Sequence, residues 1–350
     1  MNKLTKVGCS ALCGSLAVIS AANAGDLSVT GGADVTYLSN GTTSTGNPFG
    51  MASAVTFKGT GELDNGWTFE FVAAEGDGHA YSAARVAITM GGLGTLEFDQ
   101  GNSGNGIAAY DNVLPTAWEE AHGAGVSGGV KTVLGVGSSD NVQYTLPKVL
   151  GTEIALTYAF DVGSSDTADK ASGTSGANNT TGRGYDATVK INPTLGTEIL
   201  SGLNLYAGGS VVEVYDNANQ LEDKYEGVGA IVYALGPVEV GAMWSALYSG
   251  VETAATGYHT YKNHGFGVAF NVNDDFSVSY GEYQSRKAGY ERSKTQATGE
   301  EGRVVEVSSW QAAYTMGGAS FRVADVTVDN GLWSSTADSS ATIVSMGLAF

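Results

Sequence analysis

The sequence is poor in cysteine, proline and basic residues, and each shortage narrows the classes of protein that it can encode. The 350 residues include 2 Cys and 5 Pro, and Cys9 and Cys13 both lie close to the N-terminus. Because the rest of the chain has no cysteine, the protein is not a small secreted domain held together by disulfides. Beyond residue 24 no run of about 18 apolar residues occurs, which excludes membrane-spanning helices.

Residues 1–24 have the composition of a secretory signal peptide. Lys3 and Lys6 form a short basic region, the residues that follow are mostly apolar and small, and Ala22-Asn23-Ala24 is a small-x-small cleavage site. We therefore predict that residues 1–24 are cleaved and that residues 25–350 form one exported domain.

Basic charge is scarce, with 17 Lys and Arg against 36 Asp and Glu. Removal of Lys3 and Lys6 with the signal peptide takes the formal net charge from −19 to −21. This balance excludes nucleic acid as a partner, since phosphate binding needs clustered Lys and Arg. It also argues against charge-driven binding to anionic membrane surfaces. A strongly acidic outer surface would instead suit bridging to lipopolysaccharide by divalent cations.

The sequence is rich in alternating apolar and polar residues, and alternation at period two indicates β-strands with unlike faces. In the C-terminal stretch, one face carries Val344, Met346, Leu348 and Phe350, while Ile343 on the other face breaks the pattern. The same alternation recurs along the whole chain. The 51 Gly suit tight turns and close strand packing between such segments.

The alternation predicts sixteen strands, an even number as bacterial single-chain barrels require. The predicted ranges are 26–38, 51–63, 67–75, 80–90, 94–101, 139–147, 152–162, 183–193, 201–215, 223–235, 238–249, 260–272, 276–286, 303–316, 319–328 and 340–350. Short turns alternate with long loops, which is the expected layout of the two rims. We predict an all-β fold, a transmembrane antiparallel β-barrel that closes on itself because hydrocarbon offers no partner to backbone polar groups. In this barrel the first and last strands pair, and Phe350 lies beside the seam.

A barrel of sixteen strands is too wide for side chains to fill, so it encloses an aqueous channel. The longest connection, residues 102–138, narrows that channel if it folds inward, and its acids Asp111, Glu119 and Glu120 would then lie at the constriction. Basic residues on the polar faces of predicted strands would point into the lumen. These wall residues are Lys58, Arg85, Lys190 and Arg322.

The sequence resembles the trimeric general diffusion porins of Gram-negative bacteria, especially those of the alphaproteobacterial type. The resemblance rests on residues 92–98 (Gly-Leu-Gly-Thr-Leu-Glu-Phe), residues 140–147 (Asp-Asn-Val-Gln-Tyr-Thr-Leu-Pro) and the terminal Phe350. It implies that the third loop, residues 102–138, folds into the lumen and that the protein is a homotrimer. It also implies an outer-membrane location and recognition of Phe350 by the barrel-assembly machinery.

By position, Asp111, Glu119 and Glu120 resemble the loop acids of that family, and Lys58 and Arg85 resemble its basic wall. The chain departs from the family at Asp99-Gln100, where an Arg is frequent, and its basic wall is thin. We therefore predict a porin for passive diffusion of ions and small hydrophilic solutes, mildly selective for cations. Its surroundings would be outer-membrane lipids and lipopolysaccharide.

Other functions receive less support from the residues. Residues 125–129 fit the spacing of a nucleophile elbow but lack its strand–turn–helix context, so we predict no enzyme. We expect no cofactor, although Glu222-Asp223 and Glu300-Glu301 could bind Ca²⁺ at surface loops. Tyr110 and Trp118 keep open a substrate-specific channel with an aromatic slide. A barrel enzyme and a structural or adhesive barrel remain as weaker alternatives.

Overall fold

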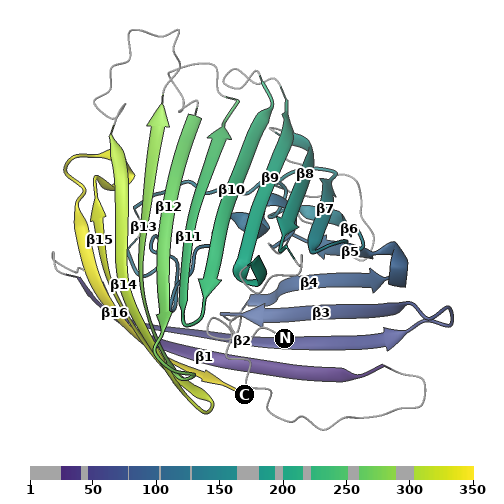
Figure 1. The fold of residues 1–350 in the computed structure, drawn as a ribbon, viewed down its shortest axis with the longest axis horizontal. Coiled ribbons are helices and arrows are strands. Elements are labelled where there is room, and N and C mark those ends of the chain that lie inside the picture. Colours follow the sequence, from purple (N-terminus) through teal and green to yellow (C-terminus); the bar gives the residue numbers. More distant parts are fainter. Residues whose placement is uncertain are drawn as a thin grey trace.

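Sixteen antiparallel strands form a closed barrel in this computed structural model of the chain (Figure 1). The structure describes residues 25–40, 46–77, 79–101, 104–126, 128–163, 181–193, 200–215, 222–250, 260–288 and 303–350. The predicted signal peptide, residues 1–24, lies outside the described residues. Each strand pairs with its neighbours in sequence, and β1 pairs with β16 to complete the circle.

The sixteen strands agree with the sequence prediction to within three residues at every end. They are β1 (Leu27–Asn40), β2 (Phe49–Glu62), β3 (Thr68–Gly76), β4 (His79–Thr89), β5 (Thr95–Gln100), β6 (Asp140–Thr145), β7 (Thr152–Ala159), β8 (Thr181–Ile191), β9 (Leu203–Val214), β10 (Lys224–Leu235), β11 (Val238–Tyr248), β12 (Thr260–Asn271), β13 (Phe276–Ala288), β14 (Val304–Met316), β15 (Ala319–Asp329) and β16 (Ser339–Ala349). β5 and β6, which flank the longest connection, are the shortest strands. The agreement follows from the strict two-residue period of a strand with one apolar face.

The described helices are short 3₁₀ turns in the connections. They are η2 (Gly91–Leu93), η3 (Gly106–Tyr110), η4 (Leu200–Gly202) and η5 (Gly331–Trp333). None of the helices in the described part of the chain is long and apolar enough to cross a membrane.

The seam between β1 and β16 includes the C-terminal residue, as predicted. Val35 pairs with Met346 in this register. At its end, the Phe350 N–H donates to the Gly31 carbonyl and the Gly31 N–H donates to the Phe350 carbonyl, both at 2.9 Å. A Cβ at position 31 would touch the Phe350 ring, so glycine there lets the terminal aromatic lie against β1.

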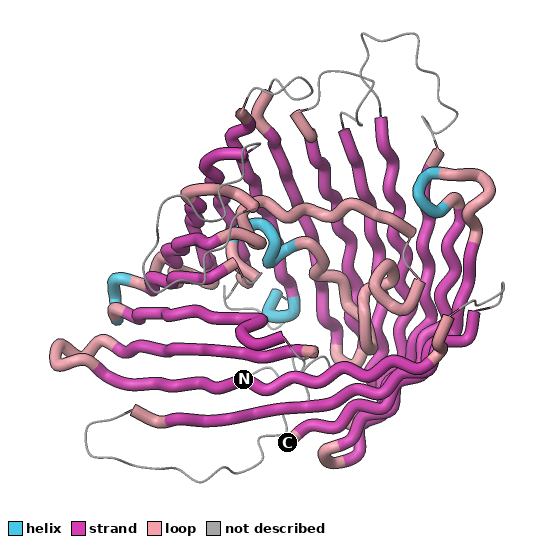
Figure 2. The backbone as a smooth tube through the Cα atoms, turned by 180° about the vertical axis from the view of Figure 1, so that it is seen from behind, coloured by secondary structure: helices cyan, strands magenta, loops and turns pink. Residues whose placement is uncertain are grey.

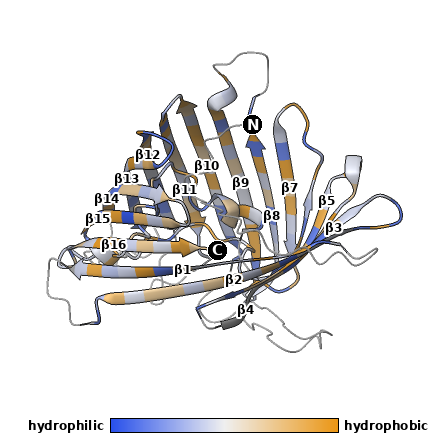
Figure 3. Ribbon diagram, turned by 90° about the horizontal axis from the view of Figure 1, so that it is seen from below, coloured by the Kyte–Doolittle hydropathy of each residue, from blue (hydrophilic) through white to orange (hydrophobic). Residues whose placement is uncertain are grey.

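The two faces of the wall differ in chemistry, and the hydropathy bands along the strands make this visible (Figure 3). One face, here called the apolar face, exposes large apolar side chains such as Phe57, Trp244, Trp310 and Leu348. The alternating positions form the polar face, where small polar side chains such as Ser279 are buried. A membrane barrel turns its apolar face to lipid, and its polar face lines the interior.

Ile343, which breaks the alternation of the last strand, has a packing partner on the polar face. It lies against a buried apolar cluster that includes Ala124 of the β5–β6 connection and Trp333 of η5. The side chains of Ile343 and Leu38 also carry the atoms that a Cβ built on Gly125 would meet first. The irregular residue is therefore explained by contact with the connection.

Candidate functional site

The described part of the β5–β6 connection, residues 104–126 and 128–139, runs along the polar face from β6 to β14. Figure 2 shows this backbone crossing the strands instead of extending beyond their ends. Its hydrogen bonds to the wall include Ala117 N–H to Ser279 Oγ at 2.8 Å, Trp118 and Glu119 N–H to Gln311 Oε1 at 3.1 and 3.0 Å, and Asn263 Nδ2 to the Lys131 carbonyl at 2.7 Å. The wall residues Asn263, Ser279 and Gln311 are all buried.

Both ends of the connection meet two buried carboxylates on the polar face. Asp186 of β8 and Glu226 of β10 are 4% and 7% exposed. Asp186 Oδ2 accepts the N–H groups of Ile107 at 2.9 Å and Val136 at 3.2 Å. Glu226 Oε2 accepts the N–H groups of Leu134 at 2.6 Å and Gly135 at 3.0 Å.

Apolar packing supports the same arrangement. Ile107, Tyr110 and Val133 of the connection form one buried cluster with Met243 and Tyr283 of the wall. Tyr110 is 8% exposed, and its ring meets that of Tyr206 edge-on at 5.2 Å. Burial raises the pKa of the Tyr110 hydroxyl to about 12. The ring is therefore part of the packing and is not presented to solutes as an aromatic slide would require.

The three predicted loop acids lie on the connection, and their surroundings differ from open solvent. Burial raises the pKa of Glu119, and the adjacent Glu120 charge raises it further, against the opposing effect of Arg322. Burial also raises the pKa of Asp111, with a contribution from Glu120. All three side chains are half-buried. They form an acidic group that is only partly solvated.

His122 lies in the same stretch and packs on the wall. Its ring centroid is 4.6 Å from that of Tyr283, and burial lowers its pKa. Within the described residues its buried Nδ1 has no hydrogen-bond partner. Burial therefore disfavours the charged form of His122, which offsets the acids beside it less than a solvated histidine would.

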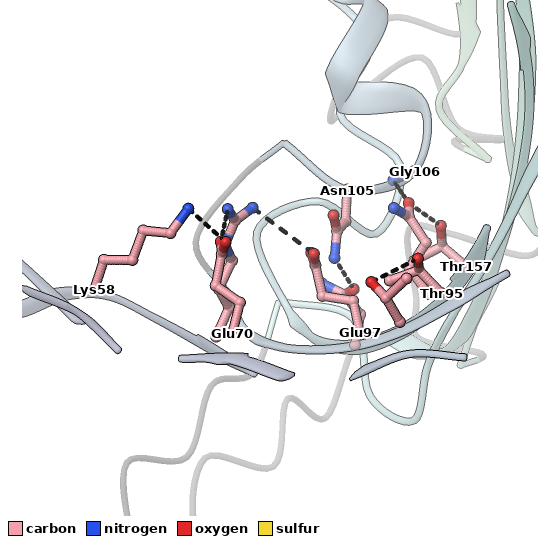
Figure 4. Close-up of polar contacts among 11 residues, drawn as sticks. Lys58, Glu70, Thr95, Glu97, Asn105, Gly106 and Thr157 are labelled. Carbon is pink, nitrogen blue, oxygen red and sulfur yellow. Dashed lines mark hydrogen bonds and ion pairs between the residues drawn. The ribbon is translucent and has the colours of Figure 1, made fainter. Parts of the chain in front are cut away.

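Two of the four predicted wall bases pair with acids of the wall itself. Lys58 Nζ lies 2.5 Å from Glu70 Oε2, and the Arg85 guanidinium lies 3.0 Å from Glu70 Oε1 and 3.7 Å from Glu97 Oε2. These four side chains come from β2, β3, β4 and β5, so charges of alternating sign cross four strands. Figure 4 shows this row, here called the charge ladder.

The ladder continues into hydrogen bonds at the start of the connection, also drawn in Figure 4. Asn105 Nδ2 donates to Asn141 Oδ1 at 3.0 Å. Gln143 Oε1 accepts the Gly106 N–H and the Thr157 hydroxyl, both at 2.9 Å. The polar face therefore changes from ion pairs on β2–β5 to neutral hydrogen bonds on β6 and β7.

The other two predicted bases have different surroundings. Arg322 pairs with Asp34, donates to Ser345 Oγ at 2.9 Å and lies 5.2 Å from the centre of the Trp118 ring. It is the predicted base that reaches the connection, since it also acts on Glu119. Lys190 Nζ lies 5.2 Å from the centre of the Tyr206 ring.

Sequence reasoning did not identify Asp186, Glu226, Glu70 or Glu97 as part of the site. An acid on the polar face of a strand looks the same in sequence whether it is wetted, paired with a base or bound to backbone N–H groups. A signal that would have helped is the pairing of strand acids with Lys58 and Arg85 in register, which needs the strand alignment.

No group of acidic, histidine or cysteine side chains that could hold a metal ion occurs among the described residues. Of the suggested calcium positions, Glu222 accepts the Tyr248 hydroxyl, and Asp223 Oδ1 accepts the Val214 N–H at 3.1 Å. Glu300-Glu301 lies outside the described residues.

The chain is similar to one known sequence family and to several solved structures. Residues 8–315 match the sequence profile of the Gram-negative porin family. No curated protein matches the chain. OmpF of Salmonella typhi, solved with daunomycin, is similar over 94% of this chain and 98% of its own, with a TM-score of 0.67 and 12% identity. The anion-selective porin from Comamonas acidovorans is similar over 93% of this chain and 99% of its own, with a TM-score of 0.64 and 12% identity. OmpT of Vibrio cholerae is similar over 96% of this chain and 100% of its own, with a TM-score of 0.62 and 10% identity.

Proposed function

The chain belongs to the Gram-negative porin family and is an outer-membrane channel, not an enzyme, and we propose that it is mildly selective for cations. In this proposal ions and small hydrophilic solutes diffuse passively through it. The observation that carries the selectivity is that Lys58 and Arg85 are paired with strand acids, whereas the connection adds Asp111, Glu119 and Glu120. A narrow passage lined by excess acid favours cations.

The test is a planar bilayer containing the refolded protein under a salt gradient. We expect stepwise conductance increments and a reversal potential of the sign that cations give. A reversal potential of the opposite sign would contradict cation preference, and the absence of steps in folded protein would contradict the channel itself.

We further propose that the β5–β6 connection is folded into the lumen and forms the constriction. The support is its hydrogen bonding to the polar faces of β8, β10, β12, β13 and β14. These side chains lie on the polar face, which lines the interior of a membrane barrel, so the hydrogen bonds favour a position of the connection inside it.

A double cysteine variant tests this placement. A Cβ built at Gly281 lies 3.4 Å from the Ala121 Cβ, close to the separation of about 3.5–4.5 Å found in disulfides. Because residues 25–350 contain no cysteine, Ala121→Cys with Gly281→Cys would form the sole disulfide of the processed protein. We expect rapid oxidative cross-linking, with each single variant as the control. A pair that stays reduced in folded protein would exclude this position of the loop.

The partners follow from the family and the surface. We propose a homotrimer, which chemical cross-linking in detergent and closure in three equal steps would reveal. Dissociated monomers that conduct in single steps would contradict it.

We also propose that assembly machinery recognises Phe350. Phe350→Ala should then lower the folded yield in cells while refolding in detergent persists, and equal yields in cells would oppose this role.

Lipopolysaccharide is the proposed lipid partner of the apolar face near its loop-bearing rim. There Gln284 Nε2 of β13 donates to Glu282 Oε1 at 2.8 Å and to Glu306 Oε2 of β14 at 3.1 Å. Carboxylates on this face suit divalent cations that bridge to lipid phosphate. Glu282→Gln with Glu306→Gln should reduce the lipopolysaccharide retained in the presence of Mg²⁺, whereas Glu239→Gln on the polar face of β11 should not. Equal retention in both would remove this proposal.

The signal peptide gives one smaller proposal. Cleavage after Ala24 would give a secreted protein whose N-terminal sequence begins at Gly25, and an uncleaved N-terminus would contradict it.

A further inference from the structure

We propose that Asp186 and Glu226 are positioning residues that hold both ends of the β5–β6 connection at one place on the wall and so fix the width of the channel. The inference rests on the proposed placement of this connection in the lumen. It goes beyond the predicted loop acids, because it assigns the control of pore geometry to two strand residues that no solute needs to touch.

The first support is the way that Asp186 joins distant parts of the chain. Its Oδ2 accepts the N–H of Ile107, near the start of the connection, and the N–H of Val136, near its end. Glu226 on β10 then binds two successive N–H groups, those of Leu134 and Gly135. Two carboxylates from two strands therefore close the root of the connection.

The second support is burial. Asp186 and Glu226 are almost inaccessible to water. Ile107, Gly135 and Val136 are buried as well. A buried backbone N–H needs an acceptor inside the protein, and a carboxylate forms shorter and stronger hydrogen bonds than a neutral oxygen does. If the carboxylate acceptor is lost, only water could replace it, and these buried positions are almost inaccessible to water.

The third support is the pair of glycines at this carboxylate. Gly106 and Gly135 adopt φ of +63° and +53°, a backbone conformation that side chains other than glycine rarely accept. A Cβ on either residue would overlap the Asp186 carboxylate. Both ends of the connection therefore carry the residue that permits close approach to the same side chain.

Together these contacts make the root rigid while leaving the acids Glu119 and Glu120 on the span between its fixed ends. Hydrogen bonds to Ser279 and Gln311 hold the middle of that span, and the root sets where both of its ends leave the wall. Releasing the root should allow several positions of the span, and each would give its own conductance.

The experiment compares single-channel recordings of Asp186→Ala, Glu226→Ala and the double variant with the unaltered chain. We expect loss of the single main conductance level, replaced by several levels and increased current noise, with the double variant most affected. Asp325→Ala is the matched control, because Asp325 lies on the apolar face of β15 and bonds to Thr342 at 2.8 Å. It should keep the main level.

A rescue separates positioning from general damage to the barrel. Adding Ala121→Cys with Gly281→Cys to the double variant and oxidising it ties the connection to β13 independently of the root. Oxidation should narrow the distribution of levels, and reduction should broaden it again. A barrel that is merely damaged would show no such redox dependence.

Hydrogen exchange on the unaltered, full-length protein covers the case in which the variants do not fold. We expect slow exchange at the amides of Ile107, Leu134, Gly135 and Val136, comparable with those of the strands. Fast exchange there would overturn the inference, as would unchanged conductance in a folded double variant. If the unaltered protein itself shows no conductance, the proposed channel function fails, which is a separate result.

Discussion

Two regions of the polar face differ in the partners of their polar side chains: one region uses ion pairs, and the other uses hydrogen bonds to the backbone of the connection. On β2–β5, Lys58, Glu70, Arg85 and Glu97 neutralise each other across neighbouring strands, and most of these side chains are partly exposed. On β8–β14, the polar residues are covered by the β5–β6 connection, and their partners are mainly its backbone groups.

The difference indicates which contacts hold the structure and which set its electrostatics. Exposed ion pairs contribute about 0–1 kcal/mol each and weaken as salt rises. Buried N–H groups that lose their acceptor cost about 1–3 kcal/mol each, with little effect of salt. We therefore expect the charge ladder and the half-buried acids of the connection to set ion preference, and the buried contacts of the covered region to control stability and pore geometry.

The largest expected effect lies in the covered region. Asp186→Leu removes the acceptor of two buried N–H groups, so the free energy of unfolding should fall by about 2–6 kcal/mol, at about 1–3 kcal/mol for each group. Urea unfolding in lipid vesicles measures it. Asp325→Leu, on the apolar face, should change the value by less than about 1 kcal/mol, because one exposed hydrogen bond is lost. Equal losses in the two variants would show that the buried contacts of Asp186 stabilise the fold no more than one exposed hydrogen bond does.

The second prediction concerns ion preference, which substitutions in the connection and in the charge ladder should change in opposite directions. Glu119→Gln with Glu120→Gln should bring the cation-to-anion permeability ratio close to one. Lys58→Met with Arg85→Met should raise this ratio, because Glu70 and Glu97 then lose their partners. Reversal potentials under a salt gradient measure both. Parallel shifts in the two double variants would show that the ladder and the connection do not face a common passage.

The third prediction uses salt to separate the regions. Glu70→Gln leaves Lys58 and Arg85 with less neutralisation and should lower the cation preference at 0.1 M salt. At 1 M salt the Debye length falls from about 10 Å to about 3 Å, so this change should nearly vanish. The altered conductance of Asp186→Ala should persist at both concentrations. A salt-dependent Asp186→Ala effect would indicate long-range charge instead of lost positioning.

The strands could be predicted from the sequence because a barrel in lipid imposes the same two-residue period on each of them. Leu348 and Phe350 had to share a face whatever the loops did. The site was less predictable, because Asp186 and Glu70 both read as acids on a polar face. One binds backbone N–H groups and the other binds two cations, and that difference depends on which segments meet across the barrel. Ile343 was the irregularity that marked a long-range contact, but its partner lies in a connection without periodicity.

The smallest expected effect concerns pH and the connection alone. Burial raises the pKa of Glu119 above its usual 4.5, and the Glu120 charge raises it further. Glu119 should therefore lose its charge on acidification at a higher pH than an ordinary glutamate, and part of the cation preference should disappear there. The folded state binds this proton more tightly than the unfolded state, so between the ordinary and the raised pKa this group lowers stability as pH rises. Glu119→Gln should weaken both dependences in reversal-potential and unfolding measurements, and the half-buried Asp111 should keep part of them. Glu75→Gln, at an exposed residue on β3, should leave them unchanged. If the titration curves of the unaltered chain and Glu119→Gln coincide, the Glu119 carboxylate is as well solvated as an exposed glutamate. The contrast between the covered region and the charge ladder would then rest on Asp186 and Glu226.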